Sequence, residues 1–500
     1  MGSGNRLLHA GIALAACAAT ASLVFFGNGL VPRWPLMWFA PLPVLVYALK
    51  RPAWEAGLVA AAPWLAGGLN MWGYLRLLKG PPVAWFTGFG LAAAVFAAGV
   101  LLMRALTRRG AVWSAWLALP AVWVSYEYVR NLLWPHGSAS CLAYSQLNFL
   151  PFLQLASLTG PWGMSFVLML FSAGLALGIH LWNPERKQAI KILGATLAVV
   201  AAVLIFGGVR LAIPPPGPQV NVGLVTSDQN PGGPAHAGAA TMQRFEAYAQ
   251  QAQDLIARGA QVVVMPEGLG VILDPDAAKA GAVFQELADR TGAVLVVGIG
   301  HVAGTVKYDE ARVYSPQAAM RSYDKEHLLP PLEDMFTPGT SRTLFQAPGK
   351  ARGQTWGVAI CKDMDFTEPA RAYGRAGVGL MLVPGGDFRV DGFWHGHIAV
   401  MRAVEDGFSL ARSARKGFVT VADNRGRIVA ETASNSAPFA TLLATVPAGH
   451  SWTLFQLLGD WFGWCSMALL VVVVAQCLQR FIRISRPVPP ELERTGQRAH

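Results

Sequence analysis

The sequence predicts a bundle of membrane-spanning helices joined to an α/β layered domain. The chain has 500 residues, of which 53% are hydrophobic and only 14% charged, whereas about 25% are charged in soluble domains. The apolar residues gather in runs long enough to cross a bilayer. Beyond residue 212, short strand-like runs alternate with amphipathic helical ones, which is typical of layered α/β folds.

Seven apolar runs precede residue 212, and an eighth lies near the C-terminus. A helix needs about 20 apolar residues to cross the hydrocarbon core. The second run is short and also fits an interfacial or re-entrant segment, and the first also fits a cleaved signal peptide. The predicted spans are 8–27, 34–49, 54–76, 83–104, 112–131, 162–182, 190–211 and 459–479.

Basic residues fall on alternate loops between these runs. The positive-inside tendency places such loops in the cytoplasm, so seven spans would deliver the following domain to the outside. Because the net charge of +11 is spread along the ends of apolar runs, it suits membrane orientation and not nucleic-acid binding. The residues are Arg6, Lys50, Arg51, Arg104, Arg108, Arg109, Arg186, Lys187, Lys191, Arg480, Arg483 and Arg486.

The α/β domain follows a proline-rich linker, since Pro214–Pro218 cannot continue a helix. With about 230 residues, the domain is large enough for its own core. Strands are predicted at 220–226, 261–265, 294–299, 356–360, 380–383 and 418–422, and helices at 241–258, 277–290 and 394–405. The expected division is 1–211 for the N-terminal transmembrane helices, 212–218 for the linker, 219–456 for the extracytoplasmic domain, 457–482 for a closing transmembrane helix and 483–500 for a cytoplasmic tail, disordered from residue 486.

The other polar residues give weaker signals. Glu127 and Arg130 lie three apart in the fifth span, which favours a mutual pair at the outer interface, with lipid headgroup contact as an alternative. The five cysteines form no disulfide framework, although Cys141 and Cys361 could pair. No Cys/His cluster has zinc-site spacing, so we expect no zinc site.

Three segments share one form, an apolar strand that ends in a reactive residue: Glu267, Lys325 or Cys361. Ligands gather at the carboxyl ends of strands in layered α/β folds, so these residues can converge. A thiolate is a strong nucleophile, a carboxylate can take the thiol proton, and an ammonium can stabilise an oxyanion. Each residue alone is more often structural or solvated, so the prediction rests on the three together.

These segments resemble the catalytic signatures of the nitrilase, or carbon-nitrogen hydrolase, superfamily. The matching stretches are Val264 to Glu267, Tyr323 to Pro330, and Ala359 to Cys361. The resemblance implies a catalytic triad of Glu267, Lys325 and Cys361, with Glu333 as a supporting catalytic residue. It also implies an αββα sandwich for the domain.

The membrane region narrows the resemblance to the bacterial apolipoprotein N-acyltransferase family, over nearly the whole chain. Segments 123–130, 143–146, 154–160 and 401–407 are similar to its motifs. The resemblance implies transfer of an acyl chain from a membrane phospholipid, through a Cys361 thioester, to the N-terminal amine of a diacylglyceryl-cysteine lipoprotein. It also implies a multi-pass protein of the bacterial cytoplasmic (inner) membrane, with its catalytic domain on the periplasmic side. The resemblance further implies that no metal and no other cofactor is required. The sequence does not indicate the oligomeric state.

Three stretches near the expected site depart from that family. Lys362-Asp363 stand in place of Tyr-Glu, residues 385–390 replace Asn-Asp-Ala-Trp-Phe-Gly, and residues 414–417 replace Thr-Asn-X-Gly. A divergent paralogue therefore stays open, as does a membrane-anchored carbon-nitrogen hydrolase (amidase) that uses water as the acceptor. A transporter or receptor that only binds its ligand is disfavoured by the complete triad, whereas a scaffold with a retired active site is a further alternative.

Overall fold

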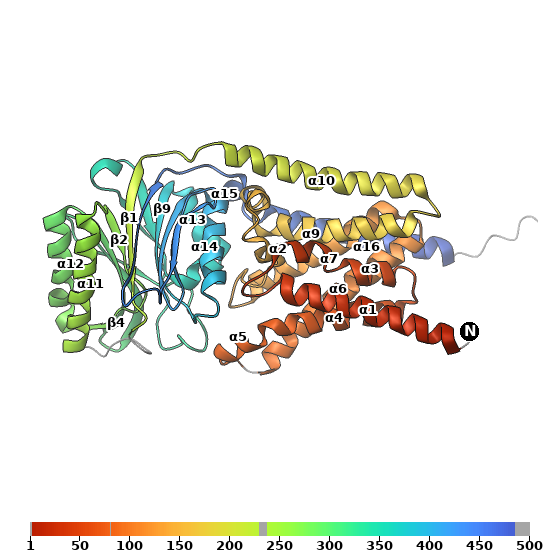
Figure 1. Cartoon of the computed structure of the whole chain (residues 1–500), viewed down its shortest axis with the longest axis horizontal. Helices are drawn as coiled ribbons and strands as arrows, with labels where there is room; N and C mark the ends of the chain where they lie inside the picture. Colours follow the sequence, from red (N-terminus) through yellow and green to blue (C-terminus); the bar gives the residue numbers. More distant parts are fainter. Residues whose placement is uncertain (1–2, 81, 230–237, 486–500) are drawn as a thin grey trace, which may run out of the picture.

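Long helices form a bundle at one end of the molecule, and two stacked β-sheets with flanking helices form the other (Figure 1). The computed structural model describes residues 3–80, 82–229 and 238–485, so the tail from residue 486 lies outside the described residues. The bundle contains α1 (Ser3–Gly27), α2 (Trp34–Phe39), α3 (Leu42–Ala48), α4 (Ala53–Gly68), α5 (Trp72–Leu77), α6 (Pro82–Arg108), α7 (Val112–Leu133), α8 (Leu150–Leu153), α9 (Ala156–Leu181), α10 (Arg186–Ala212) and α16 (Trp461–Ser485).

Five of the described helices are long and apolar enough to cross a membrane, within α1, α6, α9, α10 and α16. They correspond to the first, fourth, sixth, seventh and eighth predicted spans. The other three predicted spans also form helices, but these are shorter or less apolar. The fifth is α7, whose Trp, Tyr and Pro residues and Glu127 reduce its mean hydropathy.

The second and third predicted spans are interrupted helices. The second divides into α2 and α3 because Pro41 and Pro43 stand where the helix restarts, and proline cannot sit inside a helix without loss of a hydrogen bond. The third ends as α4, and a 3₁₀ turn leads into α5, which extends toward the α/β domain (Figure 1). Gly67 lets α4 touch α1, since a Cβ there would lie 2.5 Å from Cβ of Val24.

Two mixed sheets form the core of the α/β domain. The first has the order β13-β1-β2-β4-β5-β6, with β3 beside β4, and the second has the order β12-β11-β10-β9-β8-β7. The first contains β1 (Gln219–Thr226), β2 (Val262–Val264), β3 (Val271–Leu273), β4 (Val294–Ala303), β5 (Val306–Tyr314), β6 (Arg321–Asp324) and β13 (Ala440–Pro447). The second contains β7 (Thr343–Gln346), β8 (Thr355–Val358), β9 (Val378–Gly386), β10 (Ser409–Arg415), β11 (Phe418–Ala422) and β12 (Ile428–Ala433).

Four layers result, which confirms the expected αββα sandwich. Apolar side chains of both sheets, such as Val222 and Leu382, fill the space between them. Helices α11 (Ala239–Ala257) and α12 (Ala277–Thr291) cover the outer face of the first sheet. Helices α13 (Thr367–Arg375) and α14 (Gly392–Asp406) cover the second. Because α14 also packs against the membrane helices through Ile398 and Met401, the second sheet lies next to the bundle.

Candidate active site

Glu267 and Lys325 form the centre of the candidate site. Glu267 follows β2, and its N–H donates to the carbonyl oxygen of Gly385 at 3.2 Å. Lys325 follows β6 directly, and its Nζ lies 2.6 Å from Oε1 of Glu267 and 2.8 Å from Oε1 of Glu333. The structure therefore brings three of the four predicted site residues into one hydrogen-bonded group.

A further carboxylate in this group was not predicted from the sequence. Asp309 lies in β5, and its Oδ2 is 3.3 Å from Nζ of Lys325. Its side chain is only 6% exposed, compared with 2% for Lys325 and 8% for Glu267. The adjacent pair Asp309-Glu310 was the available signal. Neighbouring side chains of a strand point to opposite faces of the sheet, so the two acids cannot both lie on the same face.

The charges of this group follow from burial and from its single ammonium. Burial on its own would raise the pKa of Glu267, but Lys325 and a hydrogen bond with Asp309 lower it to about 2. Burial and the neighbouring charge of Glu267 raise the pKa of Asp309 well above its usual value. Burial also opposes the charge of Lys325, yet the surrounding carboxylates raise its pKa. The ammonium therefore favours the ionised form of Glu267, whereas burial and the Glu267 charge favour the neutral form of Asp309.

Cys361 opens the turn that follows β8. Its φ of +40° lies in a region that residues other than glycine rarely adopt, and such strain clusters at functional turns. The thiol donates to the carbonyl oxygen of Gly386 at 3.3 Å, and Nη2 of Arg412 lies 4.0 Å from Sγ. Burial raises the pKa of the thiol, and the Glu267 carboxylate adds to this effect, whereas Lys325 and Arg412 oppose it. The resting thiol is therefore protonated and needs a base before it can act as a nucleophile.

A buried carboxylate ties this turn to the segment that carries Lys325. Asp363 accepts hydrogen bonds from the N–H of Ile360 at 3.0 Å and from the N–H of His327 at 2.8 Å. It also accepts a bond from the hydroxyl of Tyr323 at 2.8 Å. Asp363 thus fixes the position of the nucleophile turn relative to β6, a role that its place two residues after Cys361 did not reveal.

The loop after α7 docks on the same turn. Nζ of Lys362 donates to the carbonyl oxygens of Pro135 at 2.6 Å and Leu328 at 2.7 Å. The hydroxyl of Ser138 donates to the carbonyl oxygen of Asp365 at 2.7 Å. The membrane region therefore contributes directly to the support of Cys361. Lys362, which stands where the family usually has tyrosine, links the turn to this region through these hydrogen bonds.

The ends of β9 and β10 complete the surroundings of Glu267. Arg412 and Asp387 form a buried ion pair with N–O distances of 2.6 and 3.0 Å. Gly386 leaves space between two side chains, because a Cβ there would lie 3.1 Å from Oε2 of Glu267 and 3.3 Å from Nε of Arg415. Gly386 and Arg415, which both depart from the family pattern, therefore face the candidate site.

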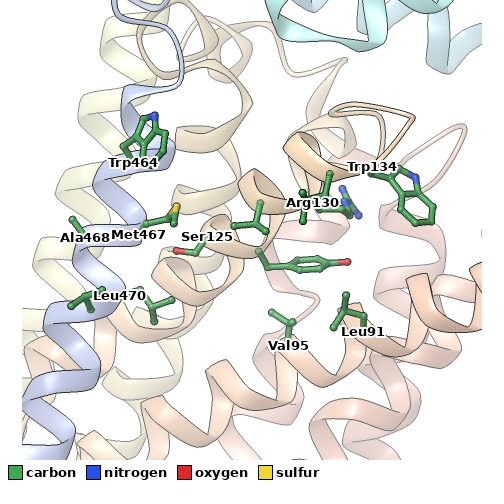
Figure 2. A pocket seen from close by; sticks show the side chains of 13 residues that line it. Leu91, Val95, Ser125, Arg130, Trp134, Trp464, Met467, Ala468 and Leu470 are labelled. Atoms are coloured by element: carbon green, nitrogen blue, oxygen red, sulfur yellow. The ribbon is translucent and has the colours of Figure 1, made fainter. Parts of the chain in front are cut away.

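A cavity of about 1170 Å³ joins this site to the membrane helices. Glu267, Lys325 and Cys361 line it in the α/β domain, and Trp64 and Tyr126 line it in the bundle. A second hollow of about 800 Å³, lined mainly by apolar side chains, lies between α6, α7 and α16 (Figure 2). The residues shared by the two are Leu91, Tyr126, Arg130 and Trp134.

The charged residues predicted in the fifth span do not form the expected ion pair. Oε1 of Glu127 instead accepts hydrogen bonds from the indole of Trp123 at 2.9 Å and the N–H of Leu142 at 2.6 Å. The guanidinium of Arg130 lies over the ring of Tyr126, with Cζ 5.3 Å from its centroid. The pairing was wrong because the backbone after α7 folds back onto Glu127. Cys141 and Cys361, the pair that the sequence left open, are both free thiols.

Carboxylate oxygens of Glu267, Asp309 and Glu333 lie within 4.8 Å of one another, close enough in principle to hold a cation. The ammonium of Lys325 already contacts all three. This cluster therefore holds its own positive charge, and its donor set does not call for a metal ion.

Comparison with known proteins identifies both parts of the chain. Residues 13–174 match the apolipoprotein N-acyltransferase N-terminal domain, and residues 224–451 match the carbon-nitrogen hydrolase family. The apolipoprotein N-acyltransferase of Geobacter metallireducens is 26% identical over 487 residues, which cover 89% of this chain and 91% of that protein. The enzyme of the same name from Bradyrhizobium diazoefficiens is 28% identical over 421 residues, 75% of this chain and 77% of that protein.

Solved structures of the nitrilase superfamily are also similar to this chain. Nit3 of Saccharomyces cerevisiae, a member of branch 10 of the nitrilase superfamily, is 21% identical with a TM-score of 0.39, covering 48% of this chain and 94% of that one. The family matches extend over most of the chain, and the named relatives match it across both regions. The chain is thus a multi-pass membrane enzyme that belongs to the apolipoprotein N-acyltransferase family and carries a carbon-nitrogen hydrolase domain.

Proposed function

We propose that this enzyme moves a fatty acyl chain from a membrane phospholipid, through a thioester on Cys361, to the N-terminal amine of a diacylglyceryl-cysteine lipoprotein. The observation that carries the proposal is the shared cavity. One continuous space contacts the Cys361 thiol, the Lys325–carboxylate group and the side chains of the membrane helices. A lipid could therefore keep its chains among the helices while its ester reaches the thiol.

The first half-reaction forms the thioester. Glu267, ionised at neutral pH, takes the proton of Cys361, and the thiolate attacks the ester carbonyl of the phospholipid. Since the Lys325 ammonium already faces three carboxylates, it would stabilise the oxyanion by its charge and not by a free N–H. The carbon–oxygen bond then breaks, and Glu267 returns the proton to the leaving lysophospholipid.

The second half-reaction forms the amide. The lipoprotein amine attacks the thioester carbonyl, and Glu267 accepts the proton of the amine. The carbon–sulfur bond then breaks, and Glu267 passes this proton to the departing Cys361 thiolate. Glu333 would keep Lys325 in place, because its Oε1 lies 2.8 Å from Nζ and its Oε2 accepts the N–H of Leu329 at 2.7 Å. Atoms and charge balance across the two steps without a cofactor.

The proposal assigns a membrane arrangement to the chain. All eight predicted spans would act as membrane segments, two of them as interrupted helices and one, α7, as a less apolar helix. The division at residues 211, 218, 456 and 482 then separates the N-terminal helices, the linker, the periplasmic catalytic domain, the closing helix and the cytoplasmic tail. Support comes from the apolar helices and from the alternation of basic loops.

Hydrolysis is the second candidate function. The observation that favours it is the replaced neighbourhood of Cys361, where Lys362 bonds to the Pro135 and Leu328 carbonyls in place of the family's tyrosine. Such a change leaves the nucleophile and alters its surroundings. Water would then discharge the thioester in place of an amine.

Intact mass measurement separates these functions. Purified protein mixed with phospholipid should gain the mass of one acyl chain, which hydroxylamine removes, and Cys361→Ala should gain none. A diacylated lipopeptide should then discharge the adduct faster than buffer does. Discharge in buffer at the same rate would favour the hydrolase, and the absence of any adduct on the wild-type protein would refute a phospholipid donor.

A further inference from the structure

One cation that faces the cavity, Arg415, has no hydrogen-bonded or ion-paired partner among the residues that the structure describes, although its charge acts on Glu267. Arg415 ends β10 and is paired with Gly386 at the end of β9. Its Nη2 lies 3.1 Å from the position of a Cβ on Gly268, and it lines the cavity. Within residues 3–80, 82–229 and 238–485, no side chain forms an ion pair with it or accepts its hydrogen bonds. Its donors are therefore available to a ligand.

The neighbouring arginines differ from Arg415 in this respect. Arg412 is saturated by the buried carboxylate of Asp387, and Arg389 pairs with Asp228 at 3.1 Å. Arg244 donates to the carbonyl oxygen of Leu269 at 2.9 Å. Burial and the nearby charge of Arg415 lower the pKa of Arg244, so these two cations lie close enough to repel each other. An anion between them would relieve their repulsion.

The position of Arg415 relative to the nucleophile indicates which substrate it meets. The thiol of Cys361 bonds to the carbonyl of Gly386, and Nε of Arg415 lies 3.3 Å from the position of a Cβ on that same glycine. A group bound by Arg415 is therefore one short spacer away from the bond that Cys361 attacks. In a phospholipid, the glyceryl backbone is such a spacer between the ester and the phosphate.

This inference rests on the proposed function. Of the two proposed substrates, only the donor carries a fixed anion near its reacting ester, whereas the acceptor presents an amine that a guanidinium would repel when protonated. We propose that Arg415 binds the phosphate of the acyl donor and so selects phosphate-bearing lipids as donors. The planar, positively charged guanidinium can bind two phosphate oxygens at once. The asparagine that the family has at this position carries no charge.

The test compares two acyl donors on the full-length protein in detergent. Phosphatidylglycerol carries the phosphate, and the p-nitrophenyl ester of the same fatty acid lacks it. Thioester formation on Cys361 is followed by intact mass for the wild type, Arg415→Gln, Arg415→Lys and the control Arg389→Gln. Arg415→Gln should lower kcat/KM about 10- to 100-fold with the phospholipid, the range of a lost charge-assisted hydrogen bond, and leave the p-nitrophenyl ester unaffected. Arg415→Lys should fall between, and Arg389→Gln should match the wild type.

Three results would overturn the inference. An equal loss of kcat/KM with both donors would indicate that Arg415 acts on the charge of Glu267 and not on the phosphate. Normal thioester formation with slower discharge by a lipopeptide would assign it to the acceptor. A control variant that loses as much as Arg415→Gln would indicate a general effect of surface charge. A wild-type protein that forms no thioester with either donor would instead refute the proposed function itself, and this outcome is recognised before any variant is compared.

Discussion

Lys325 balances the charge of the candidate site, and its removal gives the sharpest prediction from the structure. Its ammonium contacts the carboxylates of Glu267, Asp309 and Glu333 at 2.6 to 3.3 Å and is 2% exposed. In Lys325→Met these acids lose their cation but stay buried. Loss of one partner from a buried ion pair costs about 3–5 kcal/mol, since an uncompensated charge remains. For a domain of this size we expect a fall in Tm of roughly 6–20 °C.

The pH dependence of this loss has a defined sign. In the wild type, the pKa of Glu267 is lowered to about 2, so its contribution to stability is present above pH 4.5 and is lost as the pH falls toward 2. Without Lys325, burial and mutual repulsion should raise the folded-state pKa of the carboxylates above their unfolded values. Their protonated forms then stabilise the fold at low pH, and this stability is lost as the pH rises. The loss of stability in Lys325→Met relative to the wild type should therefore be larger at about pH 8 than at about pH 5.

The measurement is thermal unfolding of the full-length protein in detergent at both pH values. Lys279→Met is the matched control, because Lys279 is an exposed lysine on α12 with no ion pair among the described residues. Thioester formation on Cys361 should also be abolished in Lys325→Met. A deficit of equal size at both pH values, or one no larger than that of the control, would contradict the charge-balance explanation.

Three further substitutions test other parts of the site. Asp363→Asn should slow thioester formation and lower stability by about 1–3 kcal/mol, because an amide cannot accept all the hydrogen bonds that hold the Cys361 turn; denaturation and intact mass measure the two effects. Gly386→Ala should lower activity while Tm stays nearly unchanged, since the new methyl group enters the space beside Glu267; a large fall in Tm would contradict this. His395→Gln should lower Tm most at about pH 6. Asp365, 3.0 Å away, outweighs burial and raises the pKa of His395 well above 6.5, so the stability that His395 contributes is complete below pH 6.5 and is lost as the pH rises through the raised pKa. A loss of Tm that grows with pH would refute this explanation.

Part of the regular structure was predictable because it is specified locally, whereas strands β5, β10 and β13 were not predicted. Strand β1 and helix α12 carry apolar periodicities that burial explains, and both appear at the predicted positions. β3, a strand of three residues, was not predicted. β12 was missed because its residues are half-buried, without the alternation that marks a strand. The interruption of the second span was foreshadowed by its prolines, which limit helix length from within the sequence.

The candidate site was predictable only where a sequence motif marks it. Glu267, Lys325 and Cys361 each end a strand-like segment, so a shared edge could be inferred. Asp309 enters the group through tertiary structure, since the N–H of Lys325 bonds to its carbonyl oxygen when β6 pairs with β5. Arg415 reaches the cavity because the register of β10 on β9 places it opposite Gly386. The local sequence pattern does not specify the register between distant segments. Asp309 was therefore not predicted, and for Arg415 the sequence indicated a place near the site but not its contacts.

The membrane region and the α/β domain form one site and not a catalytic unit attached to an anchor. The turn after Cys361 takes part of its hydrogen bonding from the loop after α7, through the carbonyl of Pro135 and the hydroxyl of Ser138. Helix α14 has apolar side chains on both sides, one set against the second sheet and the other against the bundle. An isolated α/β domain would expose the second set to water and leave Nζ of Lys362 without one of its two acceptors. The position of the nucleophile therefore depends on helices far from it in the sequence, which explains how a cavity between these helices and a buried thiol are held in fixed relative positions.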